Sequence, residues 1–211
     1  MNDRSTLPWI ETIGRLSERW READSLLPAF PLLALGQPVE IDEIARASGI
    51  TADRVTRALD AARCEREEAG RIIGLYGLTL TPTLHRLEID RKVLFSCCAL
   101  WAHVIPKLVD ATVEIESIDP IRRERVRLSV SPQGLTGVDP PGAVATLAVS
   151  SQEAIDEDVC EAFCCQVCHF VSLESAEEFA AHRATCSVVD LAELQQAAQL
   201  LHQDIWSAVG V

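Results

Sequence analysis

The chain has 211 residues and a formal net charge of −13, and 48% of its side chains are apolar and 24% charged. This balance is typical of a globular protein with a hydrophobic core and excludes a disordered chain. The acidic excess argues against general binding to nucleic acid. No apolar run reaches the roughly 18 residues that a membrane helix needs. The first residues lack the apolar stretch of a signal peptide, so we expect a cytoplasmic protein without a membrane partner.

The first part of the chain, residues 1–70, is predicted to be helical. Apolar residues three or four apart predict one or two amphipathic helices between Leu7 and Ala34. A third helix is expected to end at Gly49, and Thr51 is expected to cap a fourth, over residues 52–63. A glycine-rich strand pair follows, so this part resembles a winged helix-turn-helix.

The charge of this part decides how we interpret the helix-turn-helix. Residues 40–92 hold nine basic and ten acidic side chains, whereas a helix that enters a DNA groove normally carries a basic excess. We therefore expect a scaffold packed on the main domain. A thiol-containing transcription regulator is kept as a weaker alternative, for which salt-dependent binding to duplex DNA would be the evidence.

Residues 71–211 are predicted to form an α+β core with a mixed sheet. The apolar run 94–108 predicts a buried helix that crosses the sheet, Ser175 is expected to cap a helix that ends at His182, and residues 189–209 predict a closing amphipathic helix. Prolines and Gly142 predict loops over 132–142. The predicted strands cover residues 72–80, 84–89, 111–115, 126–130, 143–149 and 163–171.

Cysteines are the most informative residues for function. In a reducing compartment, clustered thiols bind metals or act in catalysis more often than they form disulfides. Adjacent thiolates suit soft metals. A small buried apolar role is the alternative for each of them, and it is the one we expect for Cys64. The eight cysteines are Cys64, Cys97, Cys98, Cys160, Cys164, Cys165, Cys168 and Cys186, and the pair at 97–98 and the group at 160–168 are two patches.

Several short motifs between residues 72 and 182 together resemble the alkylmercury (organomercurial) lyases. They occur in the order and spacing of that family, and its members are also expected to carry a helical segment before them. The resemblance implies the fold but does not by itself establish the reaction. The motifs are Gly74–Leu80, Leu87–Asp90, Cys98-Ala99-Leu100 followed by Ile105-Pro106, Leu128–Pro132, Phe163-Cys164-Cys165, and Ser175–Glu178.

The resemblance implies a reaction that uses two separated thiols. By motif position, Cys98 on the apolar helix and Cys164 on the late strand are the capturing pair, with Cys165 as an auxiliary thiol. Thiolates are soft ligands for mercury, so the pair holds an organomercurial while the carbon–mercury bond is protonolysed to a hydrocarbon and Hg(II). No organic cofactor is required. A thiol carrier or a mercuric reductase is the expected acceptor of Hg(II).

This sequence departs from the family at the position of the proton donor. The family places an aspartate three residues after the first cysteine, and here that residue is Trp101, whose indole cannot transfer a proton at neutral pH. His103 points to another part of the helix, and Cys97, Cys165 or water are left as possible donors. Asp119 stands where the family has a further structural cysteine. The alternative function is therefore a thiol protein that binds or senses Hg, Cu or Zn without catalysis.

A second ligand pattern overlaps the first. Two thiols, a histidine and a further thiol follow one another at the spacing of a structural zinc module. The competing interpretation is that the later thiols are buried and the histidine is a polar helix end. The alternative zinc set is Cys165, Cys168, His182 and Cys186.

Overall fold

The computed structural model describes residues 7–19, 25–62 and 64–206, so the predicted helical residues 20–24, 63 and 207–209 lie outside the described residues. None of the described helices is long and apolar enough to cross a membrane. The helices are α1 (Ile10–Arg19), α2 (Ala29–Leu33), α3 (Ile41–Ser48), α4 (Ala52–Ala61), α5 (Ala99–Leu108), α6 (Gln152–Ala162), α7 (Leu173–Ala180) and α8 (Leu191–Trp206), with a short 3-10 helix η3 (Cys164–Gln166).

Two antiparallel sheets accompany these helices, which confirms the α+β class. The larger sheet has eight strands in the order β1-β2-β3-β5-β4-β6-β7-β8, and the smaller has the order β10-β9-β11. All of their pairings are antiparallel, so the prediction of a mixed sheet was wrong. The strands are β1 (Glu65–Arg66), β2 (Ile72–Leu75), β3 (Leu78–Thr79), β4 (His85–Ile89), β5 (Lys92–Ser96), β6 (Val113–Ile118), β7 (Arg125–Ser131), β8 (Gly134–Asp139), β9 (Val144–Ala148), β10 (His169–Phe170) and β11 (Cys186–Val189).

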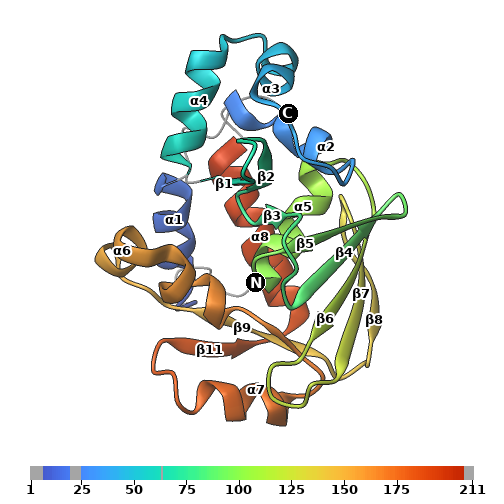
Figure 1. Cartoon of the computed structure of the whole chain (residues 1–211). Coiled ribbons are helices and arrows are strands. Elements are labelled where there is room, and N and C mark those ends of the chain that lie inside the picture. The colour runs from blue at the N-terminus through green and yellow to red at the C-terminus, as the bar shows by residue number, and fades with distance from the viewer. Residues whose placement is uncertain (1–6, 20–24, 63, 207–211) are drawn as a thin grey trace.

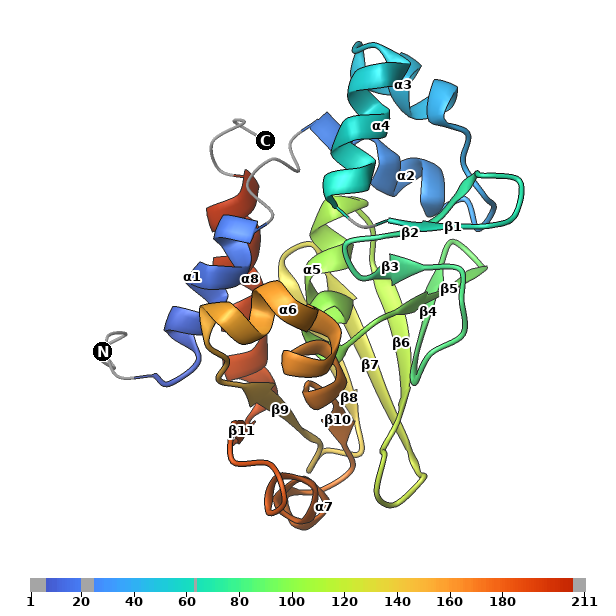
Figure 2. The same ribbon diagram turned by 60° about the vertical axis from the view of Figure 1, so that its left-hand side comes forward.

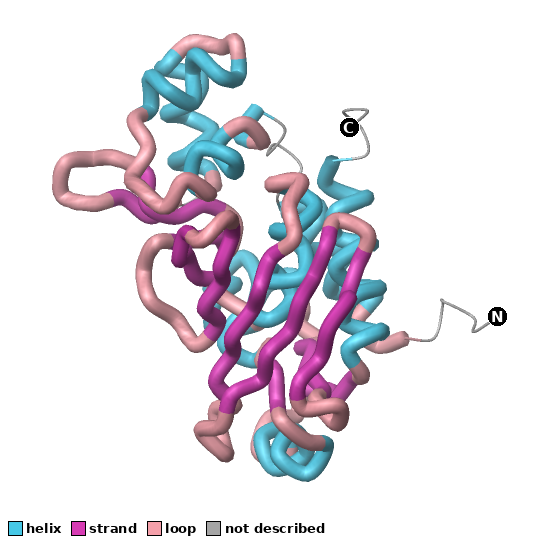
Figure 3. The backbone as a smooth tube through the Cα atoms, turned by 90° about the vertical axis from the view of Figure 1, so that its right-hand side faces the viewer, coloured by secondary structure: helices cyan, strands magenta, loops and turns pink. Residues whose placement is uncertain are grey.

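The larger sheet has one face on the core and one face toward solvent. Buried and more exposed residues alternate along β6 and β7, as expected for a sheet covered on one side. Figure 3 views the sheet from its open face, with the helices behind it. Helix α5 lies between this sheet and α8 (Figure 2) and is buried on all sides from Ala99 to Pro106. The predicted buried helix is therefore present.

The helix-turn-helix forms as its local signals indicate, at one end of the molecule (Figure 1). Helix α3 ends at Gly49, which has a left-handed φ of 67°, and the Thr51 side chain accepts a hydrogen bond from the backbone N–H of Arg54 at 3.4 Å to cap α4. Strands β1 and β2 pair across residue 70 and continue into the larger sheet. The helical part thus shares a sheet with the core.

The prediction of a helix over residues 94–108 was wrong for residues 94–98. Residues Leu94 to Ser96 belong to β5, which pairs with β4 through a tight turn at Asp90 and Arg91, both with positive φ. Helix α5 begins only at Ala99, with Cys98 in extended conformation at its N-cap. An apolar run of this kind fits a buried strand as well as a buried helix, so the sequence pattern did not separate the two.

Three other boundaries also differ from the prediction. Residues 134–139 form β8 instead of a loop, and within 163–171 only His169 and Phe170 form a strand, because η3 occupies 164–166. The helix that was expected to start at Ser175 is capped by Ser172, whose hydroxyl accepts from the N–H of Ser175 at 3.3 Å. The kinked α6 and the short β11 had no prediction at all.

Candidate active site

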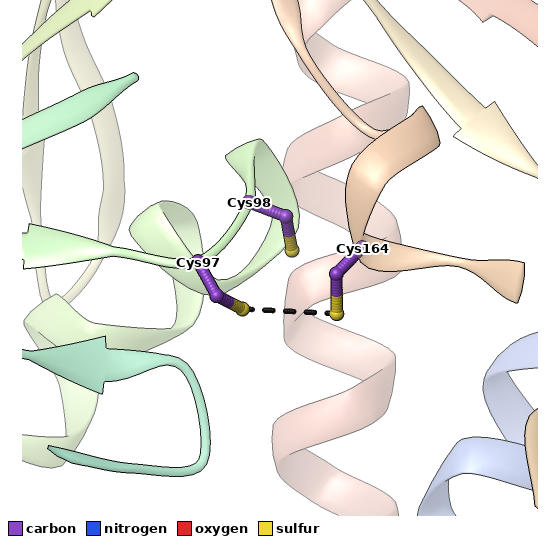
Figure 4. A group of neighbouring side chains, drawn as sticks. All are labelled: Cys97, Cys98 and Cys164. Carbon is purple, nitrogen blue, oxygen red and sulfur yellow. Dashed lines mark hydrogen bonds between the residues drawn. The ribbon is translucent and has the colours of Figure 1, made fainter. Parts of the chain in front are cut away.

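Three cysteine sulfurs meet between the start of α5 and η3. Cys97 and Cys98 lie between β5 and α5, and Cys164 begins η3 on the facing segment. Their Sγ atoms all lie within 4.8 Å of one another, and the Cys97 thiol donates to the Cys164 sulfur at 3.7 Å. Figure 4 shows the three side chains converging. Cys98 and Cys164 are thus brought together as predicted, and Cys97 joins them.

Backbone hydrogen bonds hold the two cysteine-bearing segments in place. The N–H of Cys97 donates to the carbonyl of Gly77 at 2.9 Å, and the N–H of Ala99 donates to the carbonyl of Val167, also at 2.9 Å. The second bond joins the first turn of α5 directly to the chain just beyond η3. The relative position of Cys98 and Cys164 is therefore fixed by the backbone.

Cys98 is the thiol whose surroundings favour ionisation. Burial opposes ionisation, but thiol donors on Cys164 and Cys97 and the backbone N–H of Trp101 lower the pKa of Cys98 well below its ordinary value. The N-cap position adds to this, because the amides of the first helical turn face a negative charge there. Cys98 is the expected thiolate of the group.

The other two cysteines keep their protons. The hydrogen bond between Cys97 and Cys164, together with burial and the charge on Cys98, raises the pKa of Cys97 well above its usual value. At Cys164 the donor from Cys97 lowers the pKa, but the contact with Cys98 and burial outweigh it and raise the pKa. Cys98 is therefore the sulfur of the group that ionises most readily, and Cys97 and Cys164 hold their protons more tightly.

A cavity of about 200 Å³ opens onto two of these sulfurs. Cys97 and Cys164 line it, together with Tyr76 and Trp101, whereas Cys98 lies behind them and is fully buried. The wall is mostly apolar and aromatic. Such a cavity suits a small apolar group attached to an atom that the sulfurs bind.

Trp101 both packs in the core and lines this cavity. It is 1% exposed, and its ring stacks with Tyr76 at 6.3 Å between centroids. Gly77, with a φ of 86°, leaves room for the indole, since a Cβ atom there would lie 2.2 Å from the Trp101 Cγ. Trp101 therefore occupies its place by a close fit to the β2–β3 turn.

Cys165 and the other members of the alternative zinc set lie apart from the three sulfurs. Cys165 is exposed and pairs with Cys160, Cys168 packs with Cys186 in a small separate cluster, and His182 is exposed. In the described part of the chain, the one group of three or more metal-ligating side chains is Cys97, Cys98 and Cys164. The zinc set is not gathered into such a group.

His103 faces away from the sulfurs, as expected. Its two ring nitrogens contact Gln195 at 2.8 Å and His169 at 3.2 Å. The chain of contacts continues from His169 to Ser117 and from Ser117 to His85, each at 2.8 Å. Burial lowers the pKa of both His103 and His85 to about 4. These rings are neutral at pH 7 and His103 is not positioned to replace the family's aspartate.

Asp119, which the resemblance aligns with a further cysteine of the family, has a structural role. Its buried carboxylate accepts from the backbone N–H groups of Ile121, Arg122 and Val171 and from the Ser175 hydroxyl, at 2.7–3.0 Å. These bonds tie the β6–β7 loop to the start of α7. A carboxylate with several donors stabilises this corner without a thiol.

Comparison with known proteins now assigns the chain to a family. The family described as alkylmercury lyase matches residues 78–203, and the helix-turn-helix domain of alkylmercury lyase matches residues 19–76. The chain belongs to the alkylmercury lyase family. This confirms the resemblance seen in the sequence motifs.

Individual relatives agree with this assignment. An alkylmercury lyase of Staphylococcus epidermidis is 38% identical over 72% of this chain and 68% of its own length. One from Streptomyces lividans is 32% identical over 91% of this chain and 81% of its own. The crystal structure of the mercury-bound form of MerB2 has a TM-score of 0.72 at 19% identity, covering 91% of this chain and 99% of that one, so the fold is shared.

Sequence reasoning missed two residues of this alkylmercury lyase family member. Cys97 was treated only as one of several possible donors, and Cys160 had no role, although both line the cavity. Adjacency to Cys98 was the one available signal for Cys97. No spacing rule connects Cys160 to a residue on β5 or α5.

Proposed function

We propose that this protein is an alkylmercury lyase that captures organomercurials on Cys98 and cleaves them with Cys97 and Cys164. The observation that carries the proposal is the group of three sulfurs within 4.8 Å, one of them with a lowered pKa, beneath an apolar cavity. Membership of the family supports the same reaction. An organomercurial is then the small-molecule substrate, and no organic cofactor takes part.

The reaction follows from the proton states of the sulfurs. The Cys98 thiolate bonds to mercury in R–Hg–X and displaces X⁻, which leaves R in the cavity. The Cys164 sulfur then bonds to the same mercury as the carbon–mercury bond breaks. The electron pair of that bond takes a proton, so R leaves as R–H and Hg(II) stays on two sulfurs.

Cys97 is the proton donor in this proposal. It lines the cavity in which R lies, and it contacts Cys164 at 3.7 Å. Its proton passes to the carbon, and the proton that Cys164 loses on binding mercury restores the Cys97 thiol. Trp101 shapes the cavity but does not transfer protons. Cys97 thus takes the place of the family's aspartate.

Single-turnover release of methane and benzene from methylmercury and phenylmercury tests the proposal. The reduced protein is expected to release one hydrocarbon per chain, and Cys98→Ser is expected to release none, because a hydroxyl is neither ionised at neutral pH nor a soft ligand. Cys64→Ser is the matched control, since Cys64 lies outside the cavity. Release that survives in Cys98→Ser would contradict the assignment.

A second candidate function is metal binding without cleavage, and Trp101 is the observation that favours it. The missing carboxylate removes the usual proton donor while the three sulfurs remain. This function predicts stoichiometric, Cys98-dependent binding of Hg(II) with no hydrocarbon. In either case, a thiol carrier or a mercuric reductase is the proposed acceptor of Hg(II).

A further inference from the structure

A second pair of thiols lies outside the group of three. Cys160 on α6 and Cys165 in η3 place their Sγ atoms 3.5 Å apart, and both residues are exposed. We call Cys160 and Cys165 the mouth pair. The proposed cleavage reaction uses neither residue.

The position of Cys160 results from a break in α6. Asp158 has non-helical dihedral angles (φ −151°, ψ 96°) inside the helix, and its carboxylate accepts from the N–H groups of Cys160 at 2.9 Å and Glu161 at 3.1 Å. This is an N-cap in the middle of a helix. It restarts the helix so that Cys160 lies in the first new turn and faces η3.

The position of Cys165 is fixed by its neighbour Gln166. The Gln166 side-chain amide donates to the carbonyls of Glu161 and Ala162 at 3.2 and 3.1 Å, and its oxygen accepts from the Thr185 hydroxyl at 2.9 Å. These bonds join η3 to the end of α6. The two thiols are therefore held together before any ligand arrives, which reduces the entropy lost on binding.

The mouth pair adjoins the three buried sulfurs. Cys160 lines the same cavity as Cys97 and Cys164, and Cys165 follows Cys164 directly in the chain. Carboxylates on the same helix, at Asp158 and Glu161, give this surface a negative charge that favours a divalent cation. A soft metal ion that leaves Cys97 or Cys164 through this cavity passes Cys160.

We propose that Cys160 and Cys165 form a second soft-metal site, which receives Hg(II) from the buried sulfurs and passes it to thiols in solution. The part of this inference that concerns hand-off rests on the proposed function, whereas the existence of the site does not. Thiolates select soft metal ions, and two fixed thiols bind one ion with a higher effective concentration than two separate thiols do.

The transfer balances without any change of oxidation state. Each sulfur of the mouth pair replaces one buried sulfur as a ligand of Hg(II). Cys165 first replaces Cys164, and Cys160 then replaces Cys98. The two mouth thiols lose their protons. One proton restores the Cys164 thiol, the other enters solvent, and Cys98 returns to the thiolate that the next capture needs.

Titration of the reduced full-length protein with HgCl₂, in a buffer with a competing monothiol, tests the site. The unsubstituted protein is expected to retain two equivalents of Hg(II) and Cys160→Ser one. Cys64→Ser, which removes a thiol outside both groups, is expected to retain two. Equal retention in Cys160→Ser and the unsubstituted protein would overturn the proposal.

Kinetics separate hand-off from cleavage. With little external thiol, the ratio of multiple-turnover to single-turnover hydrocarbon release is expected to fall several-fold in Cys160→Ser, and excess external thiol is expected to restore it. A ratio that stays at the unsubstituted value would overturn the transfer step. If the unsubstituted protein releases no hydrocarbon, the proposed function fails, while the Hg(II) stoichiometry still decides whether the second site exists.

Discussion

The buried group of three sulfurs and the mouth pair use the same residue type in opposite surroundings. Around Cys98, two thiol donors and the start of α5 outweigh burial and lower its pKa. At Cys160, burial and the neighbouring Cys165 thiol raise the pKa to about 11. Burial raises the pKa of both sulfurs. The difference between their pKa values therefore comes from the hydrogen-bond donors around each sulfur.

This difference matches two different tasks. Capture of a cationic organomercurial favours a sulfur that ionises readily, and Cys98, which is fully buried, is that sulfur. Hand-off needs thiols that exchange with solvent, and the mouth pair is exposed. A substitution in one region leaves the other region as an internal reference.

After Cys98→Ser, which is expected to abolish release, the next largest effect is expected from Cys97→Ala, which removes the proposed proton donor from the buried group. Single-turnover hydrocarbon release is expected to fall by about 10²–10⁴-fold, the usual contribution of a positioned general acid. Capture by Cys98 is expected to persist, measured as organomercurial retained after gel filtration. Cys64→Ala is the control, and normal release from Cys97→Ala would assign the proton to another group.

Trp101→Asp introduces the carboxylate that the sequence resemblance implies at this position, in an environment that does not suit it. Losing a buried indole that packs on Gly77 and Tyr76 is expected to lower the free energy of unfolding by about 3–5 kcal/mol. Denaturant titration measures this, with Trp101→Phe as a milder control. Because Cys97 already supplies a proton, we expect no faster single-turnover release; a rise would show that the proton donor limits the natural protein.

The sequence predicted those features that depend on local signals. Gly49 and Thr51 define the helix-turn-helix because a left-handed C-cap and a side-chain N-cap are determined by neighbouring residues. The assignment of Cys98 and Cys164 came from motif resemblance, and the structure places their sulfurs together. Leu94 was misassigned to a helix because its apolar neighbours suit either kind of buried element.

The remaining features depend on contacts between distant segments. Cys97 enters the site because β5 ends next to the β2–β3 turn, where its N–H bonds to Gly77. Cys160 enters because Asp158 interrupts α6, and nothing in the residues 152–162 alone indicates where such a helix breaks. The proton state of Cys98 required the positions of all its donors.

The buried histidines give the folded protein a defined response to acid. Burial lowers the pKa of His85 and His103 to about 4, and the unfolded chain titrates near the ordinary 6.5. The unfolded state therefore binds more protons between pH 6.5 and 4, so stability is full above pH 6.5 and falls as the pH drops. Each ring contributes up to about 3 kcal/mol over this window.

Urea unfolding at several pH values between 7 and 4.5 measures this response. His103→Gln keeps an amide that can reach Gln195 and His169 and is expected to reduce the dependence of stability on pH. His182→Gln, at an exposed position, is the matched control and is expected to keep the full dependence. An unchanged slope in His103→Gln would mean that other groups cause the acid sensitivity.

The smallest expected effect comes from the cap that positions the mouth pair. Asp158→Ala removes the acceptor for the Cys160 and Glu161 amides and is expected to lower the free energy of unfolding by about 1 kcal/mol. Asp158→Asn keeps a capping oxygen and is the matched control. Because the cap orients Cys160 but does not touch the buried sulfurs, Asp158→Ala is expected to weaken retention of the second equivalent of Hg(II) and leave the first unchanged. Equal weakening of both equivalents would show that the two thiol groups bind the metal as one site, and that the separation between capture and hand-off does not hold.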